Sequence, residues 1–369
     1  MKPQNVIISE NLERDLEQAI AQCPHDVLFV LTDETTQALC WPVIHSFSCL
    51  QQAQPIVIKP TDDHKDLESL AHVWSELGQL GGTRHSLMIN LGGGMVTDLG
   101  GFAASTFKRG INYINIPTTL LAMVDASVGG KTGINFNGLK NEIGVFNPAS
   151  TVILNTEFLK TLDHENICSG YAEMLKHGLI SNLKNWNELL SFDLSNINYK
   201  ELQRMVGISV GIKEKVVQED PLEHGIRKAL NLGHTAGHAL ESMAMKQNRT
   251  VLHGYAVAWG LICELYLSCQ KTGFPTDRMR QAVTYIKEYY GAFAFTCKEY
   301  EQLYELMTHD KKNTSGTPLT STKDGYASGF WKTTKNGVRT YTDNARAGLT
   351  WACSRVPLAV TSTGVFLSR

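Results

Sequence analysis

The chain has 369 residues, of which 43% are hydrophobic, and a formal net charge of -2. This length allows two domains, each with its own core, and the near-neutral charge offers no electrostatic case for a nucleic-acid partner. No apolar run approaches the roughly 20 residues of a membrane span, and the first residues lack the layout of a signal peptide, so we expect a soluble cytoplasmic protein. The eight cysteines are scattered without a C-x-x-C pair, which predicts reduced and chemically idle thiols.

Strand-like and helix-like segments alternate over the first 155 or so residues. The strand candidates are VLFVLT, PIVIKP, SLMIN, YINIP and TVILN. This alternation predicts an α/β fold, with a Rossmann-like parallel-sheet domain over residues 1–158. Asp33 follows the first strong strand, at the end where such sheets bind ligands.

Three adjacent glycines, Gly92, Gly93 and Gly94, separate the SLMIN strand from a segment of helical spacing at residues 96–108. Such a turn lets backbone amides approach a pyrophosphate at the positive end of a helix. The glycines do not form the spaced G-x-G-x-x-G fingerprint, so taken alone they fit an ordinary tight turn equally well.

After Phe158 the pattern changes to long helical periods with few strand candidates. We therefore place the domain boundary there and expect a mainly α-helical domain over residues 159–316.

Four residues of this second domain suggest a metal site. His234 and His238 are four apart in a segment of helical period, so both project from one helix face. A zinc protease would have Glu directly after the first His, but Thr235 stands there. His253 follows an expected loop, and Glu173 lies in an otherwise apolar helix where a bare carboxylate is costly. A single such histidine is more often a hydrogen-bonded core residue, but the set favours a metal, and spacing alone pairs His234 with His238.

The segment PTTLLAMVDASVGGKTGIN begins at Pro117 and is followed by LKNEIG at residues 139–144. These motifs closely resemble the central signature of the 3-dehydroquinate synthase family, and the resemblance extends from about residue 33 to residue 316. It implies conversion of 3-deoxy-D-arabino-heptulosonate 7-phosphate to 3-dehydroquinate and phosphate, in the shikimate pathway of aromatic amino acid biosynthesis. The implied steps are transient NAD-dependent oxidation, phosphate elimination, re-reduction and intramolecular aldol closure.

The resemblance also implies a tightly held NAD and a divalent metal, zinc in the first place and cobalt as the alternative. It changes the ligand set that spacing suggests, because it implies Glu173, His234 and His253 as ligands and His238 as a phosphate-side residue. Two histidines and one carboxylate leave a coordination position open for substrate.

The implied cofactor-binding positions lie in the first domain and at its boundary. Asp62 stands where the family's Glu-x-x-Lys motif has glutamate, which is a mild departure. The set comprises Asp33, Asp62, Lys65, Gly92, Gly93, Gly94, Asp98, Thr118, Thr119, Asp125, Lys131, Lys140, Phe158 and Thr161.

The implied substrate-binding and catalytic positions are mostly basic or amide residues, which suit a substrate with a carboxylate and a phosphate. For Lys213, in a run rich in Glu and Lys, a solvated surface lysine is the alternative. The residue matching Arg109 reaches the neighbouring subunit's site in the family, so a homodimer is implied. The set comprises Arg109, Lys131, Lys140, Asn141, Lys176, Lys213, Glu223, Arg227, Asn231, His238 and Lys312, the last within an Asp310-Lys311-Lys312 stretch.

Three other functions stay open. Another sugar phosphate cyclase, such as a 2-epi-5-epi-valiolone or 2-deoxy-scyllo-inosose synthase, would share NAD and metal but act on a substrate without the carboxylate. A metal-dependent polyol dehydrogenase would need no phosphate-binding lysines, and a non-catalytic relative would need no complete ligand set. Retention of Lys140, Asn141, Lys213 and Arg227 favours the dehydroquinate reaction.

The resemblance stops at Thr317. Residues 317–369 contain ten threonines and no glutamate, and they show no apolar stripe of helical period. We expect this tail to pack weakly against the rest of the chain.

Overall fold

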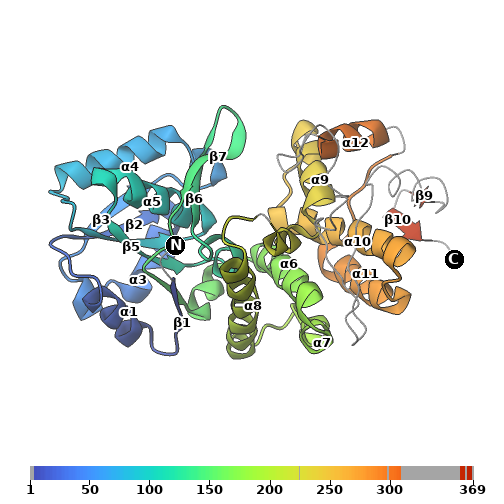
Figure 1. Ribbon diagram of the computed structural model, residues 1–369, viewed down its shortest axis with the longest axis horizontal. Coiled ribbons are helices and arrows are strands. Elements are labelled where there is room, and N and C mark those ends of the chain that lie inside the picture. The colour runs from blue at the N-terminus through green and yellow to red at the C-terminus, as the bar shows by residue number, and fades with distance from the viewer. Residues whose placement is uncertain (1–3, 224, 297–298, 309–357, 362–363, 368–369) are drawn as a thin grey trace. The chain divides into compact units, whose positions relative to one another are not determined.

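The computed structural model describes residues 4–223, 225–296, 299–308, 358–361 and 364–367 (Figure 1). The chain divides into two compact units. Unit 1 comprises Met1–Gly170 and Ile197–Glu214, and unit 2 comprises Tyr171–Asn196 and Lys215–Arg369. Because residues 197–214 return to unit 1, each unit consists of two segments of the chain. The single boundary near Phe158 stays a prediction.

Unit 1 is built on a six-stranded parallel sheet in the order β1-β8-β5-β4-β2-β3, which confirms the predicted α/β class. All residues of β2 and β4 are buried, as expected of central strands covered on both faces. Five of the strands match the predicted segments, whereas the short edge strand β1 was not predicted. The bounds are β1 Asn5–Ile8, β2 Leu28–Asp33, β3 Gln54–Ile58, β4 Leu87–Gly92, β5 Asn112–Pro117 and β8 Thr151–Leu154.

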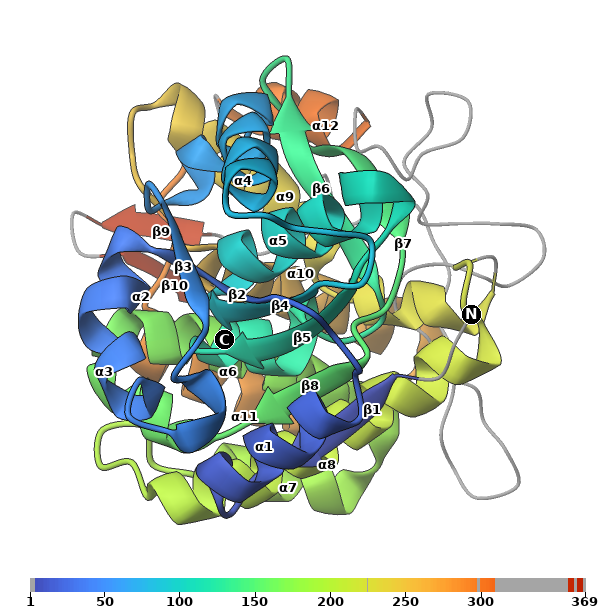
Figure 2. The same cartoon turned by 90° about the vertical axis from the view of Figure 1, so that its left-hand side faces the viewer.

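Helices cover both faces of this sheet, with α4 and α5 on one side and α1 on the other (Figure 2). An antiparallel hairpin, β6 Lys131–Phe136 and β7 Leu139–Phe146, forms a separate two-stranded sheet that was not predicted. The helices and turns of this unit are α1 Leu12–Ala21, α2 Glu34–Leu39, α3 Trp41–Ile44, η1 Ser48–Leu50, η2 Asp62–His64, α4 Leu67–Gln79, α5 Gly94–Thr106, η3 Phe107–Arg109, η4 Ala122–Ala126, η5 Thr156–Thr161 and α8 Tyr199–Glu219, which ends in unit 2.

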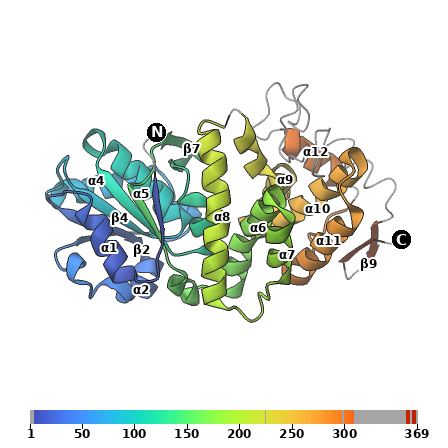
Figure 3. The ribbon, with the colours of Figure 1, turned by 60° about the horizontal axis from the view of Figure 1, so that its bottom comes forward.

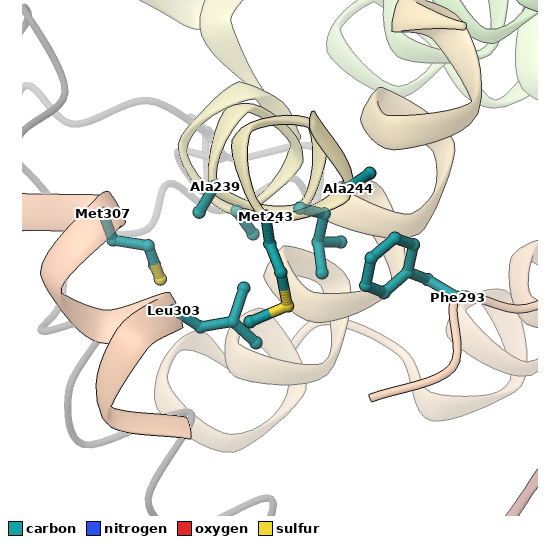
Figure 4. Packing of buried hydrophobic residues seen from close by; sticks show 8 residues of the cluster. Ala239, Met243, Ala244, Phe293, Leu303 and Met307 are labelled. Atoms are coloured by element: carbon teal, nitrogen blue, oxygen red, sulfur yellow. The ribbon is translucent and has the colours of Figure 1, made fainter. Parts of the chain in front are cut away.

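Unit 2 is mainly helical, as predicted (Figure 3). Met243, Ala244, Phe293, Leu303 and Met307 belong to one buried cluster of its core (Figure 4). Its elements include α6 His164–Ser181, which begins in unit 1, α7 Leu183–Ser191, η6 Ile226–Asn231, α9 His234–Lys246, α10 His253–Thr272, α11 Thr276–Tyr290 and α12 Tyr300–Thr308.

The predicted weak packing of residues 317–369 concerns a segment that lies outside the described residues, except for two short strands. These strands, β9 Leu358–Thr361 and β10 Gly364–Leu367, pair antiparallel. Within the described part of the chain, none of the helices combines the length and apolar character needed to cross a bilayer.

Candidate active site

Three histidines of unit 2 lie together where α9 and α10 begin. The ring centroid of His234 is 5.3 Å from those of His238 and His253, and ligand atoms of all three rings lie within 4.8 Å of one another. His234 is the first residue of α9 and follows Gly233, whose φ is 81°. A Cβ at Gly233 would also lie 2.9 Å from the Val257 carbonyl oxygen, so only glycine allows α9 to begin there. The prediction that His234 and His238 share one helix is confirmed.

Glu173 projects from α6 toward two of these rings. Its side chain is 0% exposed, and Oε1 accepts no hydrogen bond but lies 3.5 Å from Nε2 of His234 and 3.8 Å from Nε2 of His253. Two ligand atoms of a tetrahedral zinc, each about 2.0–2.1 Å from the ion, lie about 3.3 Å apart. The oxygen and the two nitrogens therefore fit a shared cation. Oε2 accepts a hydrogen bond from Lys176, which is only 1% exposed.

The Nδ1 atoms of His234 and His253 each face an oxygen atom. Nδ1 of His253 lies 3.3 Å from Oε2 of Glu241, and Nδ1 of His234 lies 3.2 Å from the Leu232 carbonyl oxygen. A proton on Nδ1 leaves Nε2 with the lone pair that a metal requires. Sequence reasoning missed Glu241, although it lies seven residues after His234 on the same helix and hence on the same face.

The segment before α9 contains three further predicted residues, two of which contact each other. Arg227 is buried, its backbone amide donates to Oδ2 of Asp220 at 3.0 Å, and its Nη1 donates to the Pro221 carbonyl at 2.7 Å. Nδ2 of Asn231 donates to Oε1 of Glu223 at 2.8 Å. Asp220 was not predicted, because its role is to accept backbone amides within this turn rather than to carry a recognisable motif.

In unit 1, Gly92 ends β4 and Gly94 begins α5, which confirms the predicted strand-to-helix turn. The N-cap residue Gly93 offers no side-chain cap, and the first turn of α5 contains no acidic residue. A Cβ at Gly93 would lie 3.0 Å from Cγ2 of Thr119, so the backbone approaches its neighbour closely. The positive end of this helix, where Gly93 and Gly94 are half-buried, suits an anion.

A network of charged and amide side chains surrounds Lys65. This lysine is 5% exposed, and its Nζ lies 3.1 Å from Oδ2 of Asp98, 2.6 Å from Oδ1 of Asn141 and 3.4 Å from Oδ1 of Asp62. Lys140 Nζ lies 3.5 Å from Oδ2 of Asp62. The structure thus unites predicted cofactor positions with predicted substrate positions.

The two carboxylates of this network titrate differently. Burial raises the pKa of Asp98 to about 6, although the ammonium of Lys65 acts in the opposite direction. For Asp62 burial also opposes ionisation, but Lys65 and Lys140 together hold its pKa below the ordinary value.

Asp33 lies outside this network. Its side chain caps α2 by accepting from the Thr36 amide at 2.7 Å, and the Thr36 hydroxyl accepts from the Asp33 amide at 3.0 Å. This carboxylate is therefore engaged in helix capping.

Lys213 of α8 is 5% exposed and donates to the carboxylate and the backbone carbonyl of Asp125 in η4. The alternative that it is a solvated surface lysine is wrong, because the side chain is buried against Asp125 although the surrounding run is rich in Glu and Lys. Arg109, by contrast, is exposed and has a φ of 69°.

Four of the remaining predicted residues lie in β6, in η5 and in the loop after β5. Lys131 is exposed at the start of β6, and Thr118 is buried next to the glycine turn. Phe158 is buried in η5, and its carbonyl accepts a 2.7 Å bond from the Thr161 hydroxyl. Lys312 lies outside the described residues.

Comparison with known protein families covers both halves of the chain. The model of the 3-dehydroquinate synthase N-terminal domain matches residues 55–169, and that of the C-terminal domain matches residues 170–313. The chain belongs to the 3-dehydroquinate synthase family.

Two relatives and two solved structures extend this result. The 3-dehydroquinate synthase of Parabacteroides distasonis is 53% identical over 316 residues, which cover 86% of this chain and 90% of the relative. That of Oceanobacillus iheyensis is 39% identical, with 85% and 86% covered. A 2-deoxy-scyllo-inosose synthase complexed with carbaglucose-6-phosphate, NAD+ and Co2+ matches with a TM-score of 0.76 and 21% identity, over 94% of this chain and 95% of that chain. A 2-epi-5-epi-valiolone synthase from Streptomyces hygroscopicus with NAD+ and Zn2+ bound matches with a TM-score of 0.72 and 22% identity, over 96% of each chain. These two structures support the fold.

Proposed function

We propose that the chain catalyses the 3-dehydroquinate synthase reaction, in which 3-deoxy-D-arabino-heptulosonate 7-phosphate is converted to 3-dehydroquinate and phosphate. It is a carbon-oxygen lyase acting on a phosphate. The strongest support in the structure is the buried Glu173, whose unbonded oxygen faces His234 and His253, in a chain 53% identical to a 3-dehydroquinate synthase. The other sugar phosphate cyclases match at only 21% and 22% identity.

The cofactors of this proposal are NAD and a divalent metal, as in the two solved cyclases. Glu173, His234 and His253 hold the metal, zinc or cobalt, and residues 159–316 form the metal-binding domain. The glycine turn holds the pyrophosphate of NAD, and residues 1–158 form its domain. The other proposed NAD contacts are Asp33, Asp62, Lys65, Asp98, Thr118, Thr119, Asp125, Lys131, Lys140, Phe158 and Thr161.

The chemistry requires both groups, because elimination of phosphate needs an acidic C–H next to the carbon that bears the leaving group. Transient oxidation of the ring alcohol to a ketone creates that acidity. When bound, NAD supplies a hydride acceptor and the metal supplies a Lewis acid for the alcohol oxygen.

The side chains orient the substrate and stabilise its charges. The proposed residues donate charge-assisted bonds to the carboxylate and phosphate, which fixes the substrate for each step. His238 and Lys140 assist the departure of phosphate, which itself takes the proton. The remaining contacts are assigned to Lys131, Asn141, Lys176, Lys213, Glu223, Arg227, Asn231 and Lys312.

The proposal includes a homodimer in which Arg109 reaches the neighbouring subunit. Its support is the hairpin strand β7, where Leu139, Ile143, Val145 and Phe146 are 37–49% exposed. Among the described strands, β7 pairs only with β6, so its other edge is open to pairing with a second copy. A cytoplasmic location is also part of the proposal, in keeping with the free thiols of Cys23 and Cys40.

A steady-state assay of phosphate release tests the function. We expect the enzyme to release phosphate from the heptulosonate phosphate in the presence of NAD and metal, and not from sugar phosphates without a carboxylate. Equal activity on the latter substrates would favour another cyclase, and no activity on either would favour a non-catalytic relative.

A further inference from the structure

The β6–β7 hairpin is irregular at Asn135. Ile134 pairs with Ile143 and Phe136 pairs with Leu139, so the register shifts across Asn135. Such bulges re-aim a side chain and are frequent beside active sites. The polar groups of Asn135 are consequently free to bond outside the regular ladder.

Asn135 bonds through its backbone and through both ends of its side-chain amide. Its backbone amide donates to the Lys65 carbonyl at 2.7 Å, and Nδ2 donates to the Asp62 carbonyl at 2.9 Å. Oδ1 accepts from the Asn141 backbone amide at 2.9 Å. Asn141 has a φ of 52°, which is uncommon for a residue other than glycine. The hydrogen bond from its amide to Asn135 therefore helps to stabilise this backbone conformation.

The segments that Asn135 joins carry different parts of the proposed site. The η2 turn supplies Asp62 and leads to Lys65, and Lys65 contacts Asp98. The hairpin supplies Lys140 and Asn141, and Asn141 Oδ1 lies 2.6 Å from Nζ of Lys65. Displacing the hairpin from the η2 turn would therefore disturb both sets of groups.

We propose that Asn135 is a positioning residue that couples the η2 turn, with the proposed NAD contacts Asp62 and Lys65, to the proposed substrate contacts Lys140 and Asn141. This inference rests on the proposed function, and it requires no contact between Asn135 and either ligand. The two hydrogen bonds of its side-chain amide join the backbone of Asp62 to that of Asn141, so their loss weakens binding of both ligands together.

The first test is Asn135→Ala, assayed for the Kd of NAD and the KM of the heptulosonate phosphate. Loss of two hydrogen bonds to neutral groups predicts an increase of about tenfold in each constant. Gln203→Ala is the matched control, because the Gln203 side chain makes the same two kinds of hydrogen bond. It donates to the Ser9 carbonyl at 2.9 Å and accepts from the Thr156 backbone amide at 3.2 Å. The control variant should lower the melting temperature as Asn135→Ala does and leave both binding constants within twofold of wild type.

Asn135→Asp distinguishes the contribution of the bond to Asp62 from that of the bond to Asn141. It keeps an acceptor for the Asn141 amide but replaces the donor to Asp62 with an oxygen, at an atom that lies 3.4 Å from Oδ2 of Asp62. We expect the Kd of NAD to increase about tenfold and the KM to change less than about threefold. An unchanged Kd of NAD in this variant would overturn the inference even if Asn135→Ala failed to fold.

The two proposals fail in different ways. Normal constants in a folded Asn135→Ala enzyme that still releases phosphate would overturn the coupling role alone. Absence of phosphate release by the wild type would contradict the proposed function, whereas NAD titration would still report the effect of Asn135 on the cofactor.

Discussion

At the scale of single residues, buried charge marks the candidate site. Lys65, Lys176 and Lys213 are each at most 5% exposed, and each lies against a carboxylate. A lysine is almost never buried without such a partner, because desolvation of the ammonium costs several kcal/mol. The contacts of Lys65 with Asp98 and of Lys213 with Asp125 could not be predicted from spacing, because only the fold brings these residues together. Lys176, by contrast, lies one helical turn after Glu173 in α6.

Asp98 predicts a pH dependence of NAD binding. Its pKa of about 6 exceeds the ordinary value of 3.8 because of burial, and the charges facing it are Lys65, Asp62 and Asp125. Below pH 6 the protonated group loses its negative charge as an acceptor, so the Kd of NAD should increase as pH falls from 8 to 5. Isothermal titration across this range should give a midpoint near 6, and Asp98→Asn should abolish that transition.

The same shift has a consequence for stability with the opposite sense. The folded chain retains this proton between about pH 4 and 6, where the unfolded chain has lost it. The contribution of Asp98 to the free energy of unfolding therefore decreases as pH rises through this window. A pH-independent difference in unfolding free energy between wild type and Asp98→Asn would contradict the assignment.

Glu241 should control metal affinity. Replacement by Gln keeps the shape of the side chain but weakens its hold on Nδ1 of His253, and loss of such outer contacts lowers metal affinity by about 10–100-fold. Competition with a chromophoric chelator measures the Kd of Zn2+ directly, without turnover. Glu288→Gln, on the exposed side of α11, is the control and should bind Zn2+ as the wild type does.

At the scale of elements, periodicity predicts what is buried and misses what is exposed. The continuous apolar runs of β2 and β4 are visible in the sequence because both faces of each strand are covered. The β6–β7 hairpin has no such signal, since all of β7 is exposed and β6 contains Gly133. The glycine turn was located correctly, but the Asn135 network was missed because its bonds depend on an irregular register.

The helix α8 provides a matched pair of lysines. Lys213 is buried against Asp125, whereas Lys215 is exposed two residues later. Lys213→Ala leaves the Asp125 carboxylate without this cation and removes the proposed substrate contact, so kcat/KM should fall about 100-fold, since one charge-assisted contact is worth roughly 3 kcal/mol. Lys215→Ala should retain wild-type kinetics. Wild-type turnover by a folded Lys213→Ala enzyme would remove this residue from the proposed site.

At the scale of the whole molecule, the two units carry separate parts of the proposed chemistry. The glycine turn and the Lys65 network belong to unit 1, and Glu173 with the three histidines belongs to unit 2. The sequence pattern predicts this separation, because alternating strands end before the long helical segments begin. The return of residues 197–214 to unit 1 was not predictable, because the helical period of this segment does not indicate which unit the helix packs against.

This separation predicts that metal removal leaves cofactor binding intact. Treatment with a chelator should abolish phosphate release, while the Kd of NAD stays within about twofold of its original value. His234→Ala should act in the same way, and added Zn2+ should restore only the chelated wild type. Full turnover by the metal-free enzyme would contradict the assignment of Glu173, His234 and His253.

The last prediction concerns the end of the chain. In unit 2, Leu303 and Met307 of α12 pack into the core cluster with Met243, so the described members of this cluster all precede residue 309 (Figure 4). Removal of residues 317–369 should leave the melting temperature and the Kd of NAD nearly unchanged, because the composition of this segment predicts few buried contacts, and such a segment adds little to global stability. Leu303→Ala is the comparison, since it creates a cavity in the same cluster at a cost of about 2–5 kcal/mol and should lower the melting temperature by about 5–15 °C. Differential scanning calorimetry of the full chain, the truncated chain and Leu303→Ala would decide the matter, and a decrease on truncation as large as that of Leu303→Ala would mean that the tail is an integral part of unit 2.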